Sequence, residues 1–274
     1  MSYEINMAHH ESFFKAFTRI PSGTFDLCVT SPPFYNARKY GSEWDYFKTE
    51  EDWLHFCLNM LICVAEVMKS EGIIWWNTGP GYAESRRLSV VEKLIIEAEK
   101  QGIFIIDKFP WCKTSALPKK YQNRPYPAWE ENIIFCKEPK LAVYYVDHVR
   151  EPYAESTLKR LKYPVGQIQS DEKGEFKKRK KVKPHPLGKT VPNYFVDKVD
   201  TSRRQHPAPM AKWLANWAIR AYSKEGDYVL DPMCGIGTVL VEAIKLERNA
   251  LGFDINEKYV VKANEALGWK TITL

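Results

Sequence analysis

The chain has 274 residues, of which 45% are hydrophobic, and a formal net charge of +6 at pH 7. A chain of this length can bury a substantial core in one large domain, or in one domain that carries an insertion, and we favour the second. No apolar run approaches the roughly 18 to 20 residues that span a bilayer, and the N-terminus lacks the pattern of a signal peptide. These features predict a cytoplasmic protein with no membrane partner.

The six cysteines form no CxxC pair, and most of them lie inside apolar segments. A thiol in such surroundings behaves as a small hydrophobic side chain. We therefore interpret the cysteines as reduced and structural, with a zinc site as the alternative. They are Cys28, Cys57, Cys63, Cys112, Cys136 and Cys234.

Strands and helices alternate through the first half of the chain. The β-branched run at 24–30 predicts a buried strand, and the segment 49–72, which opens with a Thr-x-x-Asp cap, predicts a buried helix. A strand at 72–77, a helix near 89–101 and strands at 103–111 and 131–137 follow. This alternation predicts a mostly parallel sheet with both faces covered. Because only a proline-containing link joins the last two strands, we expect one antiparallel strand at an edge.

Periodicity is lost between residues 141 and 205, which are rich in Pro, Lys and Gly. Order returns with a helix at 209–226, a strand at 228–231, a helix at 238–247, a strand at 249–254 and a helix near 257–267. We therefore expect one domain formed by residues 1–140 and 206–274, with residues 141–205 as an insertion.

The insertion carries most of the local charge imbalance. Residues 159–183 hold ten Lys or Arg against three Asp or Glu. A polyanionic partner would explain this run, and a solvated loop is the alternative.

Two consecutive prolines end the first predicted strand, in the stretch Ser31-Pro32-Pro33-Phe34. Proline fixes φ and donates no hydrogen bond, so the backbone here is rigid and extended. Its carbonyl groups are left free to accept hydrogen bonds beside an aromatic side chain. This pattern favours a binding site that accepts hydrogen bonds.

A second pattern, strand, glycine turn and helix, spans residues 228–244. Gly235 and Gly237 would let bare backbone approach a ligand at a helix N-terminus. The next strand ends at Asp254, where a carboxylate can hold two ribose hydroxyls. Asp231 ends the first strand, and a negative group there suits a cation better than a phosphate. S-adenosylmethionine, with its ammonium and sulfonium groups, is such a ligand and is the expected cofactor.

These motifs resemble those of a known family. "DPMCGIGT" (231–238) is similar to the cofactor motif of amino-methyltransferases, and "SPPF" (31–34) resembles their catalytic motif. The catalytic motif comes first, which resembles the circularly permuted β-class of DNA methyltransferases. The segments at 110–140 and 150–153 resemble members that modify the exocyclic amine of cytosine, and the segment at 206–214 resembles the motif that stands just before the cofactor loop. The resemblance implies a Rossmann-like, doubly wound α/β fold, circularly permuted, with a small basic insertion that recognises the DNA target.

The resemblance also implies roles for three groups of residues. The catalytic group is Ser31, Pro32, Pro33 and Phe34. The cofactor-binding group is Asp231, Met233, Cys234, Gly235, Gly237, Thr238, Asp254, His206, Pro207 and Glu11. The DNA-binding group is Arg38, Tyr40, Lys177, Lys178, Arg179, Lys180, Lys181 and Lys183, and no metal is expected. Arg38 and Tyr40, with Tyr35, contact DNA or else form a packed loop.

Two features depart from the family pattern. The family usually has a Gly-Asp pair near the N-terminus that contacts the adenine of the cofactor, whereas residues 8–14 here read "AHHESFF" and offer Glu11. The cofactor loop has Met-Cys where Phe with a small residue is commoner. That variant resembles RNA guanine methyltransferases, but their two motifs stand in the opposite order.

The chemistry requires a nucleophilic lone pair aligned behind the methyl group of a sulfonium. The exocyclic amine of a base is a poor nucleophile because its lone pair is delocalised into the ring. We expect the Ser31 hydroxyl and the Pro32 carbonyl to accept hydrogen bonds from the amine and localise that pair, while Phe34 stacks on the base. The base must first be flipped out of the duplex.

The sequence thus predicts a DNA methyltransferase that acts on N4 of cytosine in duplex DNA. The preference for cytosine rests on Ser31 and on the segment 107–139, both of which are family associations. The alternatives are N6 methylation of adenine by the same residues, an inactive DNA-binding protein of the same fold, and an RNA or protein substrate. A cognate restriction endonuclease is a candidate partner, and the protein is expected to be a monomer or a homodimer.

Overall fold

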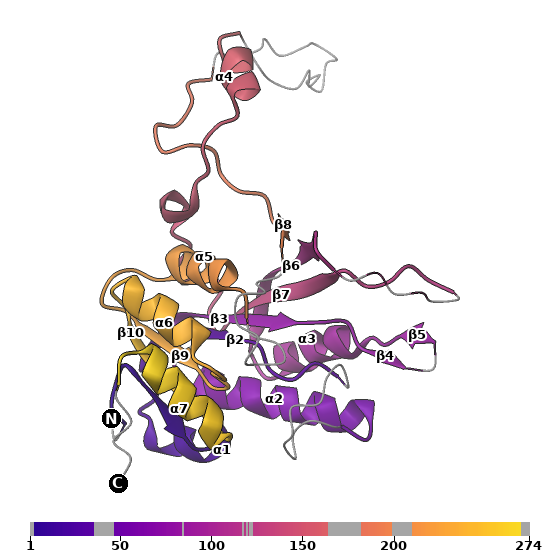
Figure 1. Cartoon of the computed structure of the whole chain (residues 1–274), viewed down its shortest axis with the longest axis vertical. Coiled ribbons are helices and arrows are strands. Elements are labelled where there is room, and N and C mark those ends of the chain that lie inside the picture. The colour runs from indigo at the N-terminus through magenta and orange to yellow at the C-terminus, as the bar shows by residue number, and fades with distance from the viewer. Residues whose placement is uncertain are drawn as a thin grey trace. The chain divides into compact units, whose positions relative to one another are not determined.

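The computed structural model describes residues 3–35, 47–83, 85–116, 118, 120, 123–163, 182–198 and 210–269 (Figure 1). The chain divides into two compact units. The larger unit comprises Met1–Tyr144 and Asn193–Leu274, and the smaller unit comprises Tyr145–Pro192. No helix among the described residues is both long enough and apolar enough to cross a bilayer.

Within the described residues, the larger unit is built on an eight-stranded sheet with the order β1-β10-β9-β2-β3-β7-β6-β8. The strands are β1 (Met7–His10), β2 (Phe25–Thr30), β3 (Met68–Thr78), β6 (Phe104–Lys113), β7 (Trp129–Cys136), β8 (Phe195–Asp197), β9 (Tyr228–Asp231) and β10 (Asn249–Asp254). A short hairpin of β4 (Tyr82–Ala83) and β5 (Arg86–Arg87) stands apart from this sheet.

The sheet is parallel except at β7, which runs antiparallel to both of its neighbours, β3 and β6. The predicted mixed sheet with an antiparallel strand near one edge is therefore confirmed. The short strand β8, which the sequence did not predict, pairs with β6. Because β10, β9, β2 and β3 are parallel neighbours, their carboxyl ends lie along one edge of the sheet, where ligands bind in open α/β folds.

Helices cover both faces of the sheet (Figure 1). Side chains of α1 (Phe13–Ala16), α2 (Glu50–Val67) and α3 (Val90–Lys100) pack into one core cluster, and those of α5 (Lys212–Tyr222), α6 (Thr238–Lys245) and α7 (Glu257–Ala266) pack into the other. Strand β3 shows why two cores form. Ile74 and Trp76 belong to the first cluster, while Ile73 and Trp75 belong to the second, since successive side chains point to opposite faces.

The predicted start of α2, with Thr49 as its cap, is confirmed. The Thr49 hydroxyl accepts a hydrogen bond from the Asp52 amide at 3.0 Å, and the Asp52 carboxylate accepts one from the Thr49 amide at 3.0 Å. The predicted end at residue 72 is too late. The backbone is already extended at Met68, which pairs with Phe25 of β2, so residues 68–71 belong to the strand.

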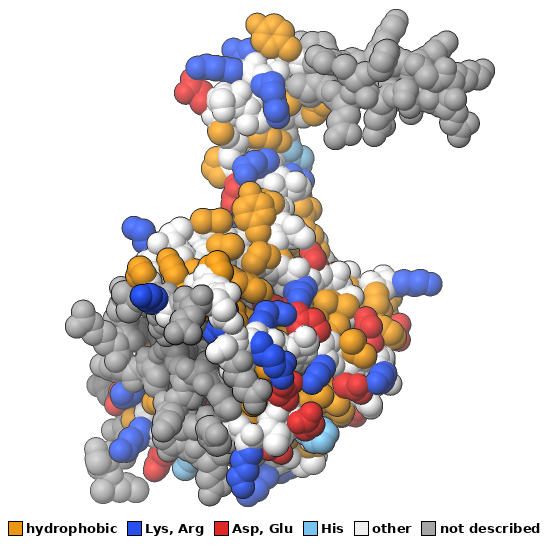
Figure 2. Space-filling model, turned by 90° about the vertical axis from the view of Figure 1, so that its right-hand side faces the viewer, with side chains coloured by type: hydrophobic (Ala, Val, Ile, Leu, Met, Phe, Trp, Pro, Cys, Tyr) orange, Lys and Arg blue, Asp and Glu red, His pale blue; other side chains and the backbone are white. Residues whose placement is uncertain are grey.

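The smaller unit holds little regular structure among its described residues. It contains a short 3-10 helix, Val146–Val149, and the helix α4 (Glu155–Leu161). An isolated bridge joins Glu151 to Lys189, and Arg150 donates a hydrogen bond to the Gly188 carbonyl at 3.1 Å. Several Lys and Arg side chains on this unit are exposed (Figure 2). They include Lys159, Arg160, Lys162 and Lys183.

Candidate active site

The two motifs found in the sequence meet at the carboxyl edge of the sheet. Strand β2 ends at Thr30 and strand β9 ends at Asp231, and these strands are neighbours. The Thr30 hydroxyl donates a hydrogen bond to Asp231 Oδ1 at 3.1 Å, although the two residues are 201 positions apart. Ser31, the next residue, therefore starts its loop beside the glycine turn.

The proline-rich loop after β2 is fixed by contacts to its neighbours. Pro32 is buried, and the Pro33 carbonyl accepts a hydrogen bond from Trp53 Nε1 of α2 at 2.8 Å. The predicted extended backbone thus presents one carbonyl to the protein itself. Tyr35 is 8% exposed and belongs to the core, which favours the packed-loop reading for this residue. The DNA-contact predictions for Arg38 and Tyr40 lie outside the described residues.

Phe34 lies against a glycine at the end of the neighbouring strand. A Cβ atom on Gly79, which follows β3 directly, would lie 2.6 Å from Phe34 Cδ2. The ring therefore packs on bare backbone in a place that only glycine leaves open. Sequence reasoning did not single out Gly79, although a glycine just after a strand with an apolar centre is a visible signal.

The Ser31 hydroxyl donates a hydrogen bond to Asn77 Oδ1 at 3.0 Å. Asn77 lies in β3 and is almost fully buried. This partner was not predictable from the sequence, since Asn77 closes an apolar run and is 46 positions away from Ser31.

The turn after β9 has the backbone that the sequence predicted. Gly235 and Gly237 have φ values of 50° and 77°, in the left-handed region that favours glycine. The Gly235 amide donates to Asp254 Oδ2 at 2.9 Å, so the turn is tied to the end of β10. A Cβ atom on Gly237 would lie 2.8 Å from the Cβ atom of Ala263 in α7. Thr238 begins α6 at this close contact and is buried.

Asp231, the last residue of β9, is a buried acid next to this turn. Its Oδ1 accepts hydrogen bonds from the Thr30 hydroxyl and, at 3.2 Å, from the Met233 amide. Burial, followed by the nearby charge of Asp254, outweighs these bonds and raises the pKa of Asp231 from 3.8 to about 7. Burial also raises the pKa of Asp254, whose carboxylate accepts from the Gly235 and Asn256 amides. A cation beside Asp231 would favour its ionised form.

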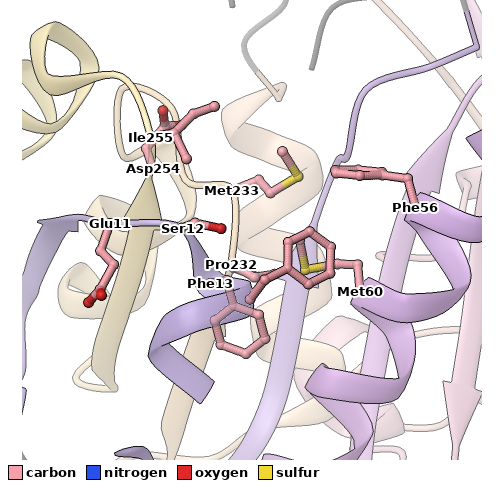
Figure 3. Close-up of a pocket in the computed structure, with 10 residues that line it drawn as sticks. Glu11, Ser12, Phe13, Phe56, Met60, Pro232, Met233, Asp254 and Ile255 are labelled. Atoms are coloured by element: carbon pink, nitrogen blue, oxygen red, sulfur yellow. The ribbon is translucent and has the colours of Figure 1, made fainter. Parts of the chain in front are cut away.

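A mainly apolar pocket opens next to Asp254 (Figure 3). It contains about 300 Å³ of empty space, part of it open to solvent. Ten residues line it: Glu11, Ser12, Phe13, Phe14, Phe56, Met60, Pro232, Met233, Asp254 and Ile255. They come from the segment after β1, from α1 and α2, and from the turns after β9 and β10.

Glu11, the candidate contact to the cofactor adenine, lies at the pocket, but its carboxylate is bonded to other side chains. It accepts a hydrogen bond from the Tyr3 hydroxyl at 2.7 Å and pairs with Arg19. Burial favours the neutral acid, yet the bonds from Tyr3 and Arg19 outweigh it and lower the pKa of Glu11. In Figure 3 this carboxylate points away from the pocket. Only the rest of the residue, with the neighbouring Ser12, faces the site.

The remaining predicted site residues differ in where they lie. Met233 lines the pocket, whereas the Cys234 side chain is buried against Gly252, where an added Cβ would lie 2.9 Å from that of Cys234. The cysteine can therefore offer a ligand only its backbone. Lys183 is exposed on the smaller unit. Seven further predicted site residues lie outside the described residues: Lys177, Lys178, Arg179, Lys180, Lys181, His206 and Pro207.

Sequence comparison gives a family and several relatives. A family model described as a DNA methylase matches residues 25–265. The type II methyltransferase M1.MboII of Moraxella bovis is 29% identical over 274 residues, which cover 96% of this chain and 97% of the relative. M.HpaI of Haemophilus parainfluenzae is 26% identical over 260 residues, which cover 92% of this chain and 71% of the relative.

Solved structures share the fold. The PvuII DNA methyltransferase (cytosine-N4-specific) superposes with a TM-score of 0.71 at 18% identity, covering 97% of this chain and 87% of that one. A putative DNA modification methylase from Thermus thermophilus, complexed with S-adenosyl-L-methionine, superposes with a TM-score of 0.62 at 18% identity. The match covers 96% of this chain and 93% of that one. At this identity the likeness concerns the fold alone.

Proposed function

The chain belongs to the DNA methylase family and is a DNA amino-methyltransferase that uses S-adenosylmethionine, and we propose that it methylates N4 of cytosine in duplex DNA. The observation that carries this proposal is the Thr30–Asp231 hydrogen bond, which holds Ser31 beside the cofactor turn. The choice of base is supported by serine as the first residue of the catalytic motif and by the fold shared with the PvuII enzyme, which is cytosine-N4-specific.

The residues at the carboxyl edge fit the parts of the cofactor. The buried Asp231 carboxylate suits the ammonium group, since burial raises its pKa and a neighbouring cation would favour its ionised form. Asp254 still has acceptor capacity for ribose hydroxyls, because a carboxylate offers about four lone-pair sites. The apolar pocket lined by Phe13, Phe56 and Met60 suits the adenine ring. S-adenosylmethionine supplies a methyl group on a sulfonium, from which the C–S electron pair leaves with sulfur.

The chain's own task is to make the amine of the base nucleophilic. The Ser31 hydroxyl oxygen and the Pro32 carbonyl accept hydrogen bonds from the two amine protons, which localises the nitrogen lone pair. The nitrogen gains the methyl group through a new C–N bond and releases one proton to water. No covalent link to the enzyme is required, so positioning supplies most of the acceleration.

Phe34 serves as the platform for the flipped base. Its ring is held on the bare backbone of Gly79, so its face is set before DNA binds. Stacking of a base on an aromatic side chain is worth about 1 to 3 kcal/mol, which offsets part of the energy needed to flip it. Phosphate contacts supply the remainder.

Those phosphate contacts come from the insertion. The smaller unit exposes Lys159, Arg160, Lys162 and Lys183, and the basic run of 159–183 continues through residues outside the described ranges. Contacts from lysine and arginine to phosphate supply affinity that is independent of sequence. We assign target recognition to the insertion on this basis.

The test is to identify the methylated nucleoside. The protein is incubated with labelled S-adenosylmethionine and mixed-sequence duplex DNA, which is then digested and examined by mass spectrometry. N4-methyldeoxycytidine is the expected product. N6-methyldeoxyadenosine would keep the mechanism and overturn the base assignment, and binding of cofactor without any modified base would indicate an inactive DNA-binding protein.

Ser31→Ala provides the matched control in the same assay. Because Ser31 does not line the cofactor pocket, affinity for S-adenosylmethionine should stay nearly unchanged while turnover falls by about 10²-fold or more. Equal turnover in the two proteins would contradict the role assigned to the hydroxyl.

A further inference from the structure

A line of polar side chains runs from Ser31 across the sheet. The Ser31 hydroxyl donates to Asn77 Oδ1 at 3.0 Å, and Asn77 Nδ2 donates to Asn132 Oδ1 at 3.2 Å. Asn132 Nδ2 in turn donates to the main-chain carbonyl of Phe109 in a longer contact of 3.5 Å. The chain crosses β3, β7 and β6, where Asn77 pairs with Asn132 and Asn132 pairs with Phe109 in register.

Both asparagines are buried among apolar residues. Asn77 is 2% exposed and Asn132 is 0% exposed. A pair of buried amides gives little net stability that an apolar pair of the same shape would not give, because each amide must first lose its contacts with water. Stability alone therefore does not explain why two amides occupy facing positions at the end of the sheet nearest Ser31.

The far end of the line fixes the direction of every hydrogen bond. The Phe109 carbonyl can only accept, so Asn132 must turn its NH₂ group toward it and its oxygen toward Asn77. Asn77 must then turn its own NH₂ group toward Asn132 and its oxygen toward Ser31. The only group left for Ser31 to offer is its proton.

We propose that Asn77 and Asn132 are positioning residues that hold the Ser31 hydroxyl as an acceptor toward the target amine. With its proton committed to Asn77, the Ser31 oxygen presents lone pairs to the substrate and cannot compete as a donor. The inference rests on the proposed function, since it explains how a hydroxyl, which can donate or accept, is limited to accepting. No proton moves along the chain, because both amides are neutral.

The first test compares two substitutions of Asn77. Asn77→Asp keeps an oxygen that accepts the Ser31 proton, whereas Asn77→Leu has a similar size and accepts nothing. Burial at this position favours the neutral acid, so Asn77→Asp keeps a hydroxyl that donates to Asn132 as well as the acceptor for Ser31. In single-turnover methylation of duplex DNA, Asn77→Leu should lower the rate by about 10- to 100-fold, and Asn77→Asp should lose clearly less. Affinity for S-adenosylmethionine should not change in either protein, because Asn77 does not line the pocket. Equal losses in the two variants would overturn the proposal.

A matched control uses an asparagine at the opposite end of the sheet. Asn249 begins β10 and donates a hydrogen bond to the Gly226 carbonyl at 2.8 Å. Asn249→Leu should leave the methylation rate unchanged. A loss equal to that of Asn77→Leu would mean that the assay reports general damage to the fold, and the positioning role would fall.

The second test is a double-mutant cycle with Ser31→Ala. If the asparagines act through the hydroxyl, Asn77→Leu and Asn132→Leu should cause little further loss once that hydroxyl is absent. Losses that multiply would show independent structural damage and overturn the inference. Should Asn77→Leu fail to fold, Asn77→Ala replaces it in both tests.

The same cycle separates this inference from the proposed function. A Ser31→Ala protein that methylates as fast as the unmodified protein refutes the role of Ser31 itself. A slow Ser31→Ala protein with multiplying losses refutes only the positioning role of the asparagines.

Discussion

Asp231 places a carboxylate where the protein excludes water. Its two hydrogen bonds, from the Thr30 hydroxyl and the Met233 amide, do not offset the loss of solvent, and burial raises its pKa from 3.8 to about 7. An ionised acid that is buried in this way lowers the stability of the folded protein, but it can form a strong pair with a bound cation. If Asp231 holds the ammonium group of the cofactor, as we propose, the residue couples the stability of the free protein to cofactor binding.

The sign of that coupling can be worked out. Because folding raises the pKa of Asp231, the folded chain binds this proton more tightly than the unfolded chain, so stability falls as pH rises from about 4 to about 7. Asp231→Asn removes the ionised form. We expect its free energy of unfolding to exceed that of the unmodified protein by about 2 to 4 kcal/mol at pH 8 and to differ little at pH 4. Chemical denaturation at both pH values measures this difference.

The same substitution should weaken the cofactor complex. An amide cannot pair with the ammonium group, so affinity for S-adenosylmethionine measured by calorimetry should fall by about tenfold or more at pH 8. A variant that is more stable but binds the cofactor as tightly would separate the raised pKa from binding, and would show that Asp231 does not contact the ammonium group.

Gly79 offers a second test at single-residue resolution. A Cβ atom there would lie 2.6 Å from Phe34, so Gly79→Ala should displace the ring from its place. If Phe34 is the stacking platform, kcat/KM for DNA should fall by about tenfold or more, with cofactor affinity unchanged. Gly72→Ala is the control for crowding elsewhere in the same strand, because its Cβ would meet Met68 Cε at 2.9 Å and the Lys69 backbone at 3.0 Å without touching Phe34. An active Gly79→Ala enzyme would argue that Phe34 does not carry the base.

Among the elements, β1 shows what a local pattern cannot predict. Its four residues, Met7–His10, have no strong strand preference, so the strand was not predicted from the sequence. The strand lies at the edge of the sheet, where one row of backbone groups has no strand partner. Asn264 of α7 fills that place. Its Oδ1 accepts from the Ala8 amide at 2.8 Å, and its Nδ2 donates to the Ala8 carbonyl at 2.9 Å. The residue that stabilises this edge strand is therefore 256 positions away in the sequence from Ala8, the strand residue it contacts.

This element leads to a test of how β1 supports the pocket. Asn264→Ala removes both hydrogen bonds to Ala8 and should lower the free energy of unfolding by about 1 to 3 kcal/mol. Because β1 leads into the segment of Glu11, Ser12 and Phe13, cofactor affinity should fall as well. Asn264→Asp, which keeps the acceptor but loses the donor, should be intermediate in urea denaturation. A stable Asn264→Ala protein with normal affinity would contradict this role.

Over the whole molecule, the sequence predicted what local patterns encode and missed what pairs distant segments. Alternating strands and helices, the Thr49 cap and the glycine turn at Gly235 were all predictable, because each depends on neighbours in the chain. The pocket was not, since it joins side chains from four separate segments. Neither was the partner of Ser31. Asn77 comes within hydrogen-bond distance of Ser31 only because β2 and β3 pair in the sheet.

The division into two units gives the last prediction. If the insertion binds the phosphates of DNA, a variant with four lysines replaced by glutamine should bind DNA more weakly and with less dependence on salt. The four lysines are Lys177, Lys178, Lys180 and Lys181. Each lost phosphate contact should lower the slope of log K against log salt concentration by about 0.9. Binding is measured by fluorescence anisotropy across a range of salt concentrations, with S-adenosylmethionine affinity as a check that the larger unit is intact.

The matched control removes the same charge from the larger unit. Lys15, Lys100, Lys224 and Lys258 are all exposed, and replacing them with glutamine lowers the net charge equally. If only overall charge attracts DNA, both proteins should lose affinity and slope alike. A local interface predicts a large change for the insertion and a small one for the control. An unchanged slope in the insertion variant would mean that its lysines are simply solvated and that the phosphate contacts lie elsewhere on the protein.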